Sequence, residues 1–233
     1  MDNIILYTPD ILSNPELPAE EALHCVKVLR MKEGDQVLLT DGKGTFFEAS
    51  IVQAHLKHCI VDIKKTIEYH RPWKFNLQIA FAPTKNMDRV EWFAEKATEI
   101  GIDCFSPILC QFSERKEIKL PRIEKILVSA MKQSQKAILP QLNQLTSFSD
   151  FIKQDFEGRK FIAHCYGTPK AELKATYRKG ENVLIMIGPE GDFSEKEVEE
   201  AIAAGFEPVS LGQSRLRTET AALVACHTIH VLN

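Results

Sequence analysis

Two glycine-bearing stretches near the carboxyl end hold the residues best suited to chemistry. The first, Gly188–Asp192, carries two carboxylates, and the second, Gly212–Thr218, carries Arg215 and Arg217. The carboxylates would repel phosphates but tolerate a cofactor with a positive centre and free hydroxyls. The guanidinium groups suit an anionic substrate, or one that becomes anionic during reaction. The pattern therefore predicts a site where such a cofactor and substrate meet.

The elements that must position these loops follow from the surrounding pattern. Val183–Ile187 is an unbroken apolar run that stops at Gly188, which is typical of a strand buried on both faces of a parallel sheet. Ser194 and Glu197 have the spacing of a capping box, so we expect a helix to begin there. The first stretch is therefore predicted to lie between a strand and a helix.

This helix is predicted to lead into a further strand. Val198, Ala201 and Ile202 mark its apolar face, and Gly205 supplies a left-handed stop before the short strand Pro208–Leu211. Ligands of open α/β sheets bind beyond the carboxyl ends of strands. We therefore expect the two glycine-bearing stretches to lie side by side in one pocket.

Both stretches resemble the carboxyl-terminal signature of a known enzyme family. The residues concerned are Gly188-Pro189-Glu190-Gly191-Asp192-Phe193-Ser194, Leu211-Gly212 and Leu216-Arg217-Thr218-Glu219-Thr220-Ala221. They resemble the SPOUT methyltransferases, specifically the family that methylates N3 of a uridine in small-subunit (16S) ribosomal RNA. Residues upstream that resemble the same family are Lys85, Arg89, Glu91, Lys96, Glu99, Gly101, Ala130, Gln133, Ser134, Pro140, His24, Val28, Leu29 and Arg30.

The resemblance implies a fold with two parts. Residues 1–70 would form a small PUA-like β-barrel that binds RNA. Residues 71–233 would form an α/β methyltransferase domain, with a trefoil-knotted, mostly parallel sheet and helices on both faces. In the knot, the segment around Leu211–Thr218 would be tucked through a loop near Gly188.

The resemblance also implies a homodimer through the knotted domain. The final helix, expected over Glu219–Val231, would lie at the interface. Leu223 and Ile229 are candidate contacts, although burial within a single chain would explain them equally well.

The implied reaction is S-adenosyl-L-methionine-dependent methylation of uracil N3. This nitrogen carries a proton at neutral pH, so the reaction needs a base and a group that stabilises negative charge on O2 and O4. Arg217 and Glu219 are the first candidates for these catalytic roles, with Glu190 behind them. Alternatively, Thr218 and Glu219 have only a structural role at the start of the final helix. Thr218 would cap the helix, and the negative charge of Glu219 would interact favourably with the helix dipole.

We expect the cofactor to be bound mainly by backbone groups of the glycine-rich turns. The strand predicted over Lys160–Cys165 ends at the pocket rim, where the backbone after His164 could contact adenine. The expected cofactor-binding residues are Cys165, Gly167, Ile187, Gly188, Pro189, Glu190, Gly191, Leu211, Gly212, Leu216 and Thr218.

Charge distribution favours an RNA partner more than net charge does. A net charge of -3 argues mildly against one. However, residues 115–136 include seven basic and two acidic side chains, which predicts a phosphate-binding surface, with a merely solvated helix face as the alternative. The partner implied by the resemblance is ribosomal RNA or the small ribosomal subunit. The candidate RNA-binding residues are Lys27, Arg30, Lys85, Arg89, Arg115, Lys132, Lys136 and Arg215.

The remaining elements follow from periodicity. Before residue 70 we expect a strand over residues 3–7, a helix opened by Pro18 with Ala22, Leu23, Val26 and Leu29 inward, a hairpin over residues 36–52 and a strand over residues 59–63. After residue 70 we expect strands Phe75–Ala82 and Cys104–Leu109 and helices Met87–Ile100 and Pro121–Lys136. This alternation predicts a mostly parallel sheet covered on both faces.

Several protein classes are disfavoured. The sequence shows neither a signal peptide nor a run of about 18 apolar residues, so we expect a cytoplasmic protein without a membrane partner. Six scattered cysteines fit neither a disulfide framework nor a zinc site. His55 and His58 are predicted to lie on opposite faces of a strand, so no metal site is expected.

Three classes of function remain open. The favoured class is the uridine-N3 methyltransferase, and the near alternative is a related knotted enzyme that acts on tRNA or on a ribose 2'-hydroxyl. A non-catalytic RNA-binding protein is the distant alternative. The glycine motifs typical of nucleotide-triphosphate and dinucleotide enzymes are absent from the sequence.

Overall fold

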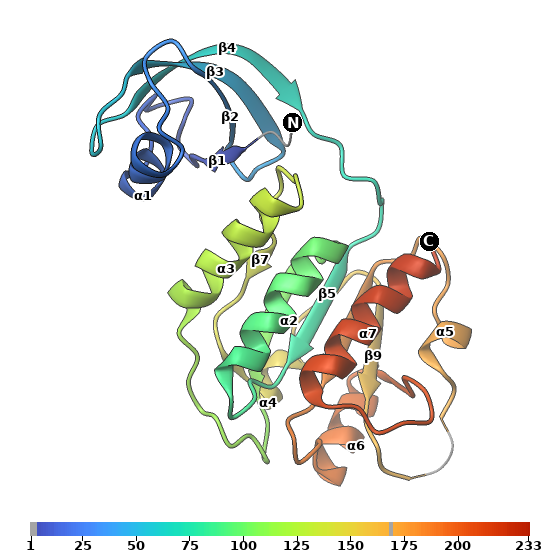
Figure 1. The fold of residues 1–233 in the computed structure, drawn as a ribbon. Helices are drawn as coiled ribbons and strands as arrows, with labels where there is room; N and C mark the ends of the chain where they lie inside the picture. The colour runs from blue at the N-terminus through green and yellow to red at the C-terminus, as the bar shows by residue number, and fades with distance from the viewer. Residues whose placement is uncertain (1–3, 168–169) are drawn as a thin grey trace. The chain divides into compact units, whose positions relative to one another are not determined.

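The computed structural model describes residues 4–167 and 170–233, and these fall into two compact units (Figure 1). The smaller unit combines the residues up to Pro72 with Val128–Leu139. The larger unit combines Trp73–Leu127 with Pro140–Asn233. A domain boundary after residue 70 stays a prediction, and the contacts add a later segment to the amino-terminal residues.

The smaller unit is built on a four-stranded sheet in the order β1-β2-β3-β4. Its strands are β1 (Ile5–Tyr7), β2 (Gln36–Thr40), β3 (Thr45–Gln53) and β4 (Ile60–Glu68). β1 runs parallel to β2, and the other pairs are antiparallel. The predicted hairpin and the strand after it are therefore confirmed.

One helix contributes to the core of the smaller unit. α1 (Ala19–Leu23) continues into a π-helical turn, η1 (His24–Val28). Ala22 and Cys25 are fully buried among the sheet residues, whereas Leu23 is 45% exposed. The prediction that Leu23 faces inward was wrong, because it lies about 100° around the helix axis from Ala22, which takes the core position.

The segment Val128–Leu139 is bonded to the turn between β2 and β3. The amide of Gly44 donates to the carbonyl of Ala137, and the amide of Leu139 donates to the carbonyl of Gly42, both at 2.8 Å. Gly42 and Gly44 have φ values of 73° and 107°, a region that glycine enters without strain. The two glycines of this turn therefore allow the main chain to bond with residues that lie far away in the sequence.

The larger unit is built on a sheet in which the described strand pairs are parallel, as predicted. The order is β11-β9-β10-β5-β6-β7, with β8 paired to β6. The strands are β5 (Leu77–Phe81), β6 (Cys104–Leu109), β7 (Gln141–Leu142), β8 (Thr146–Ser147), β9 (Arg159–Ala163), β10 (Val183–Ile187) and β11 (Glu207–Val209). The carboxyl ends of the neighbouring strands β9, β10, β5 and β6 therefore share one edge.

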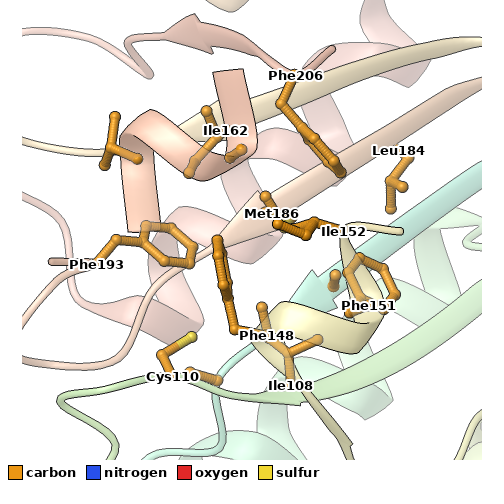
Figure 2. Close-up of a cluster of buried hydrophobic side chains, with 14 residues drawn as sticks. Ile108, Cys110, Phe148, Phe151, Ile152, Ile162, Leu184, Met186, Phe193 and Phe206 are labelled. Carbon is orange, nitrogen blue, oxygen red and sulfur yellow. The ribbon is translucent and has the colours of Figure 1, made fainter. Parts of the chain in front are cut away.

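Helices cover both faces of this sheet. After Trp73 the helices are α2 (Met87–Ile100), α3 (Leu120–Gln133), α4 (Phe148–Phe151), α5 (Leu173–Thr176), α6 (Glu195–Ala203) and α7 (Thr218–Val231). α2 and α7 pack together, and α7 packs on β5 and β10. On the other face, Phe148 of α4 and Phe193 before α6 pack near Met186 of β10 (Figure 2). Because strand side chains alternate between faces, all five residues of β10 are buried, as its apolar run predicted.

α6 begins and ends as its sequence predicts. The Ser194 hydroxyl and the Glu197 carboxylate form both bonds of the capping box, and Gly205 beyond the helix has a φ of 86°. Ala201 is buried, but Ile202 is 47% exposed, so the predicted inward position of Ile202 was wrong. The left-handed turn at Gly205 returns the chain to the sheet, and Phe206 fills the core there instead.

Candidate functional site

The loops that follow β9, β10 and β11 are joined by two hydrogen bonds. The Asp192 carboxylate, after β10, accepts the amide of Cys165, after β9, at 2.7 Å. The Thr218 hydroxyl, after β11, donates to the carbonyl of Gly188 at 3.0 Å. Asp192 holds a φ of 68°, a strained value for a residue with a side chain. The two glycine-bearing stretches of the sequence therefore contact each other.

α7 begins without a side-chain cap. Its N-cap residue is Arg217, and Thr218 is the first helical residue. The alternative in which Thr218 caps the helix was therefore wrong, because its hydroxyl bonds to Gly188 instead. This bond fixes the first turn of α7, which carries Glu219, beside the end of β10.

The Glu219 carboxylate is almost buried, at 9% exposed for the residue. Its Oε1 lies 3.7 Å from Arg89 Nε, and its Oε2 is buried without a hydrogen-bond partner among the described residues. A buried polar atom without a partner is costly, so Oε2 is suited to accept a proton from a ligand. The narrow pocket beside it is lined by Phe81, Ala82, Thr84, Val90, Phe93, Thr218, Glu219 and Ala222.

Glu190 and Arg115 both hold the loop after β5. Glu190 is exposed, and its Oε1 accepts the amide of Lys85 at 3.0 Å. The Arg115 guanidinium donates to the carbonyls of Thr84, at 3.1 Å, and Lys85, at 2.6 Å. Both side chains therefore position this loop, and their expected parts in catalysis and RNA binding stay predictions.

Arg217 and Arg215 are exposed on the loop before α7. The Arg217 guanidinium makes no hydrogen bond or ion pair with the residues described in the structure, whereas its carbonyl accepts the amide of Ala221 at 2.7 Å. Arg215 lies near the Cys165 thiol, whose pKa is raised by partial burial and by the Asp192 carboxylate and is lowered to a smaller extent by Arg215. Both guanidinium groups are therefore available to an incoming anion.

His164 is a site residue whose side chain the sequence did not reveal. Both ring nitrogens are buried, and neither has a hydrogen-bond partner in the described part of the chain. Burial lowers the pKa of this imidazole, and Lys170 lowers it further, although Asp192 opposes them. The only sequence signal was its place at the end of a strand next to the pocket.

The other expected cofactor residues lie along the same edge. Ile187, Gly188 and Pro189 are buried, Leu211 and Leu216 are half-buried, and Gly191 is exposed. Gly167 and Gly212 have φ values of 79° and 127°, and, among the residues that the structure describes, a Cβ on either would meet no atom within 4 Å apart from its own chain neighbours. Open space therefore adjoins the backbone of two of these loops.

The candidate RNA-binding residues divide between the two units. Lys85, Arg89, Arg115 and Arg215 belong to the larger unit, and Lys27, Arg30, Lys132 and Lys136 belong to the smaller one. Lys27 and Arg30 are exposed, whereas Lys132 is paired with Glu21. Near the site, a recess of about 430 Å³ is lined by Lys85, Glu114, Arg115, Lys116 and Glu117.

His55 and His58 lie in the turn between β3 and β4, with their rings stacked at 5.6 Å. The prediction that a strand separates them onto opposite faces was wrong, because β3 ends before His55. Across residues 4–167 and 170–233, no cluster of three His, Cys, Asp or Glu side chains is arranged to hold a metal ion. Over the same residues, no helix has the length and apolar character needed to cross a bilayer.

Comparison with known proteins identifies related domains and structures. A family described as an RNA methyltransferase domain matches residues 71–230, and one described as an RNA methyltransferase PUA domain matches residues 17–64. The chain is similar to ribosomal RNA small subunit methyltransferase E of Bacillus subtilis, with 32% identity over 91% of this chain and 88% of the relative.

Solved structures also resemble the chain over nearly its whole length. The probable rRNA methyltransferase of Porphyromonas gingivalis is 46% identical, with a TM-score of 0.93 and coverage of 98% of this chain and 97% of that one. Ribosomal RNA small subunit methyltransferase E of Neisseria gonorrhoeae, bound to S-adenosyl methionine, is 25% identical, with a TM-score of 0.85 and coverage of 99% and 98%.

Proposed function

The chain belongs to the RNA methyltransferase family, and from this premise we propose that it methylates N3 of a uridine in small-subunit ribosomal RNA, using S-adenosyl-L-methionine. The observation that carries the proposal is the bond between Thr218 and Gly188, inside the region matched by the family. It joins the two loops whose residues resemble the uridine-N3 methyltransferases.

The residues present fit S-adenosyl-L-methionine. Gly167 and Gly212 leave open space beside their backbones, where a ribose and an adenine can be hydrogen-bonded by main-chain groups. The carboxylates of Glu190 and Asp192 oppose phosphates but favour a sulfonium. When bound, this cofactor supplies an electrophilic methyl group on a positively charged sulfur.

The protein's part in the reaction is to remove a proton and stabilise charge. Glu219 Oε2 accepts the proton from uracil N3, and the N3 electron pair then forms the new bond to the methyl carbon as the carbon–sulfur bond breaks. Arg217 stabilises the negative charge on O2 and O4. Orientation of the two reactants contributes further, because effective molarity can be worth roughly 7 kcal/mol or more.

The finer architecture belongs to the same proposal. The segment Leu211–Thr218 passes through a loop near Gly188 as a trefoil knot of the SPOUT type, and the bond between Thr218 and Gly188 supports this path. The enzyme forms a homodimer through α7. Leu223 is half-buried and remains a candidate contact, whereas Ile229 is fully buried within its own chain.

The RNA partner is the small ribosomal subunit or its ribosomal RNA. The exposed side chains of Lys27, Arg30 and Arg215 are free to meet phosphates. An exposed basic side chain adds to RNA affinity in a salt-dependent way, so we expect these residues to act mainly on binding.

The test is mass spectrometry of ribosomal RNA from cells with and without this protein. The proposal expects N3-methyluridine in small-subunit RNA to disappear with the protein and to return when purified protein and S-adenosyl-L-methionine are added to the isolated subunits. A methyl group on tRNA or on a ribose 2'-hydroxyl, or no methyl transfer at all, would overturn it.

A further inference from the structure

Phe112 is a large aromatic residue exposed at the edge of the candidate site. It lies on the loop after β6 and is 44% exposed. A Cβ on Gly191 would lie only 3.0 Å from the Cβ of Phe112. Phe112 therefore flanks the loop that carries Gly188 and Glu190.

The loop that carries Phe112 is fixed on both sides of it. Before it, the amide of Gln111 donates to Glu197 Oε1 at 2.7 Å. After it, the Ser113 hydroxyl accepts the amide of Cys110 at 3.0 Å, and Arg115 is bonded to the carbonyls after β5. Single exposed apolar residues are common on protein surfaces, but here the loop bonds hold one in place next to a reaction site.

We propose that Phe112 is the platform on which the target base stacks, an inference that rests on the proposed function. N3 lies on the edge of uracil that base pairing covers, so the base must be unpaired and turned out before it can react. A base turned out of its stack is commonly covered by an aromatic side chain, which contacts any base through its π face. Phe112 positions the base in this way, and Glu219 and Arg217 act on it.

The recess of about 430 Å³ is lined in part by residues that follow Phe112 in the chain, Glu114 to Glu117, and is suited to a phosphate of the same RNA. Among its lining residues, Lys85 is paired with Glu114 at 3.0 Å, and the Arg115 guanidinium bonds to carbonyls. Lys116 is exposed and has no hydrogen bond or ion pair with the residues described. The Lys116 ammonium is therefore free to meet a phosphate of the RNA that carries the target base.

The experiment measures methyl transfer to small ribosomal subunits purified from cells that lack the protein. Phe112→Ala is expected to lower kcat/KM for the subunit by roughly 5- to 150-fold, mainly through a higher KM, since that is the range for loss of one stacked base. Phe112→Tyr and Phe112→Trp are expected to stay within about threefold of the wild type, because they keep an aromatic face. Calorimetry should show unchanged affinity for S-adenosyl-L-methionine in all three variants.

Two further variants sharpen the result. Phe112→Leu keeps apolar volume without a ring and should resemble Phe112→Ala, and Ile202→Ala, which also truncates an exposed apolar residue of the larger unit, should match the wild type. Wild-type kcat/KM in Phe112→Ala or Phe112→Leu, or weaker binding of S-adenosyl-L-methionine, would overturn the stacking role. An inactive wild-type protein would instead overturn the proposed function.

Discussion

At the scale of single residues, the site contrasts a buried carboxylate with an exposed guanidinium. Glu219 is held in the first turn of α7, and one of its carboxylate oxygens has no hydrogen-bond partner in the part of the chain that the structure describes. Arg217, two residues earlier, is exposed, and its guanidinium has no partner among the described residues. A proton acceptor must be oriented before the substrate arrives, whereas a charge stabiliser can close on it afterwards. The two positions match these different demands.

Arg217→Ala is expected to lower kcat by about 100- to 1,000-fold, because it removes a group that stabilises charge only as the reaction proceeds. The melting temperature and the affinity for S-adenosyl-L-methionine should stay close to wild type, since the Arg217 side chain is exposed and makes no bond within the described chain, and the substitution keeps its main-chain bond to Ala221. Transfer of radiolabelled methyl groups measures the effect, with Arg217→Lys as a partly active control. Wild-type turnover in Arg217→Ala would remove this residue from the site.

Because His164 is buried, we expect the stability of the folded protein to depend on pH. Its pKa is lowered in the folded state, first by burial, so the unfolded chain binds more protons below pH 6.5 or so. The stability it contributes is complete above that pH and is lost as the pH falls towards the folded-state pKa. Between pH 8 and pH 5, the melting temperature should therefore fall less steeply for His164→Gln than for the wild type. An equal dependence of melting temperature on pH in the two proteins would contradict this.

Residue type alone was enough to propose some of the candidate site residues. Arg217 and Glu219 were expected there because a guanidinium and a carboxylate are recognisable in any sequence. His164 and Phe112 were missed, because their importance depends on burial of two nitrogens and on exposure of a ring. Neither property can be read from a residue type alone.

At the scale of elements, the site depends on the joint between β10 and α7. Thr218 is 7% exposed, and its hydroxyl satisfies the carbonyl of Gly188 at the end of the strand. This joint places a helix start, with its favourable field for negative charge, beside the loop expected to hold the cofactor. The loop before α7 is therefore fixed at its carboxyl end by the bond between Thr218 and Gly188.

Thr218→Val should destabilise the protein by roughly 1–3 kcal/mol, because it leaves a buried carbonyl without its donor while keeping the side-chain volume. Urea denaturation measures this change, and calorimetry should show weaker binding of S-adenosyl-L-methionine as the Gly188 loop loosens. Thr218→Ser keeps the hydroxyl and should lie close to wild type in both measurements. Equal stability of the Val and Ser variants would show that the bond contributes nothing.

Local sequence patterns predicted bonds within one element but not bonds between elements that are distant in the sequence. The capping box of Ser194 and Glu197 was predicted because both its bonds are local. The third bond of Glu197, to the amide of Gln111, joins residues 86 positions apart and has no sequence signature. Periodicity likewise predicted strand β10, but not that Ile202 would be exposed and Phe206 buried beyond a turn.

At the scale of the whole molecule, each compact unit is made of two separate pieces of chain. Val128–Leu139 belongs with the amino-terminal residues, through main-chain bonds to the turn between β2 and β3. The family resemblance implied two domains in succession, with the first ending near residue 70. It could not show this later segment, whose partners lie about 90 residues earlier.

A fragment of residues 71–233 is expected to be less stable than the corresponding part of the full chain. It would leave Ala137 and Leu139 without their partners at Gly44 and Gly42. Size-exclusion chromatography and thermal unfolding should show aggregation or a lower melting temperature. Co-expression with residues 1–72 should restore a soluble complex, and a monodisperse fragment with full-length melting temperature would contradict the expectation.

The shared membership of Val128–Leu139 also sets an order of events during synthesis. The sheet of the smaller unit is complete once Glu68 has been made, but its partner segment ends only at Leu139. A nascent chain must therefore leave the ribosomal tunnel past this residue before the unit can close, and by then the first strands of the methyltransferase sheet have also emerged.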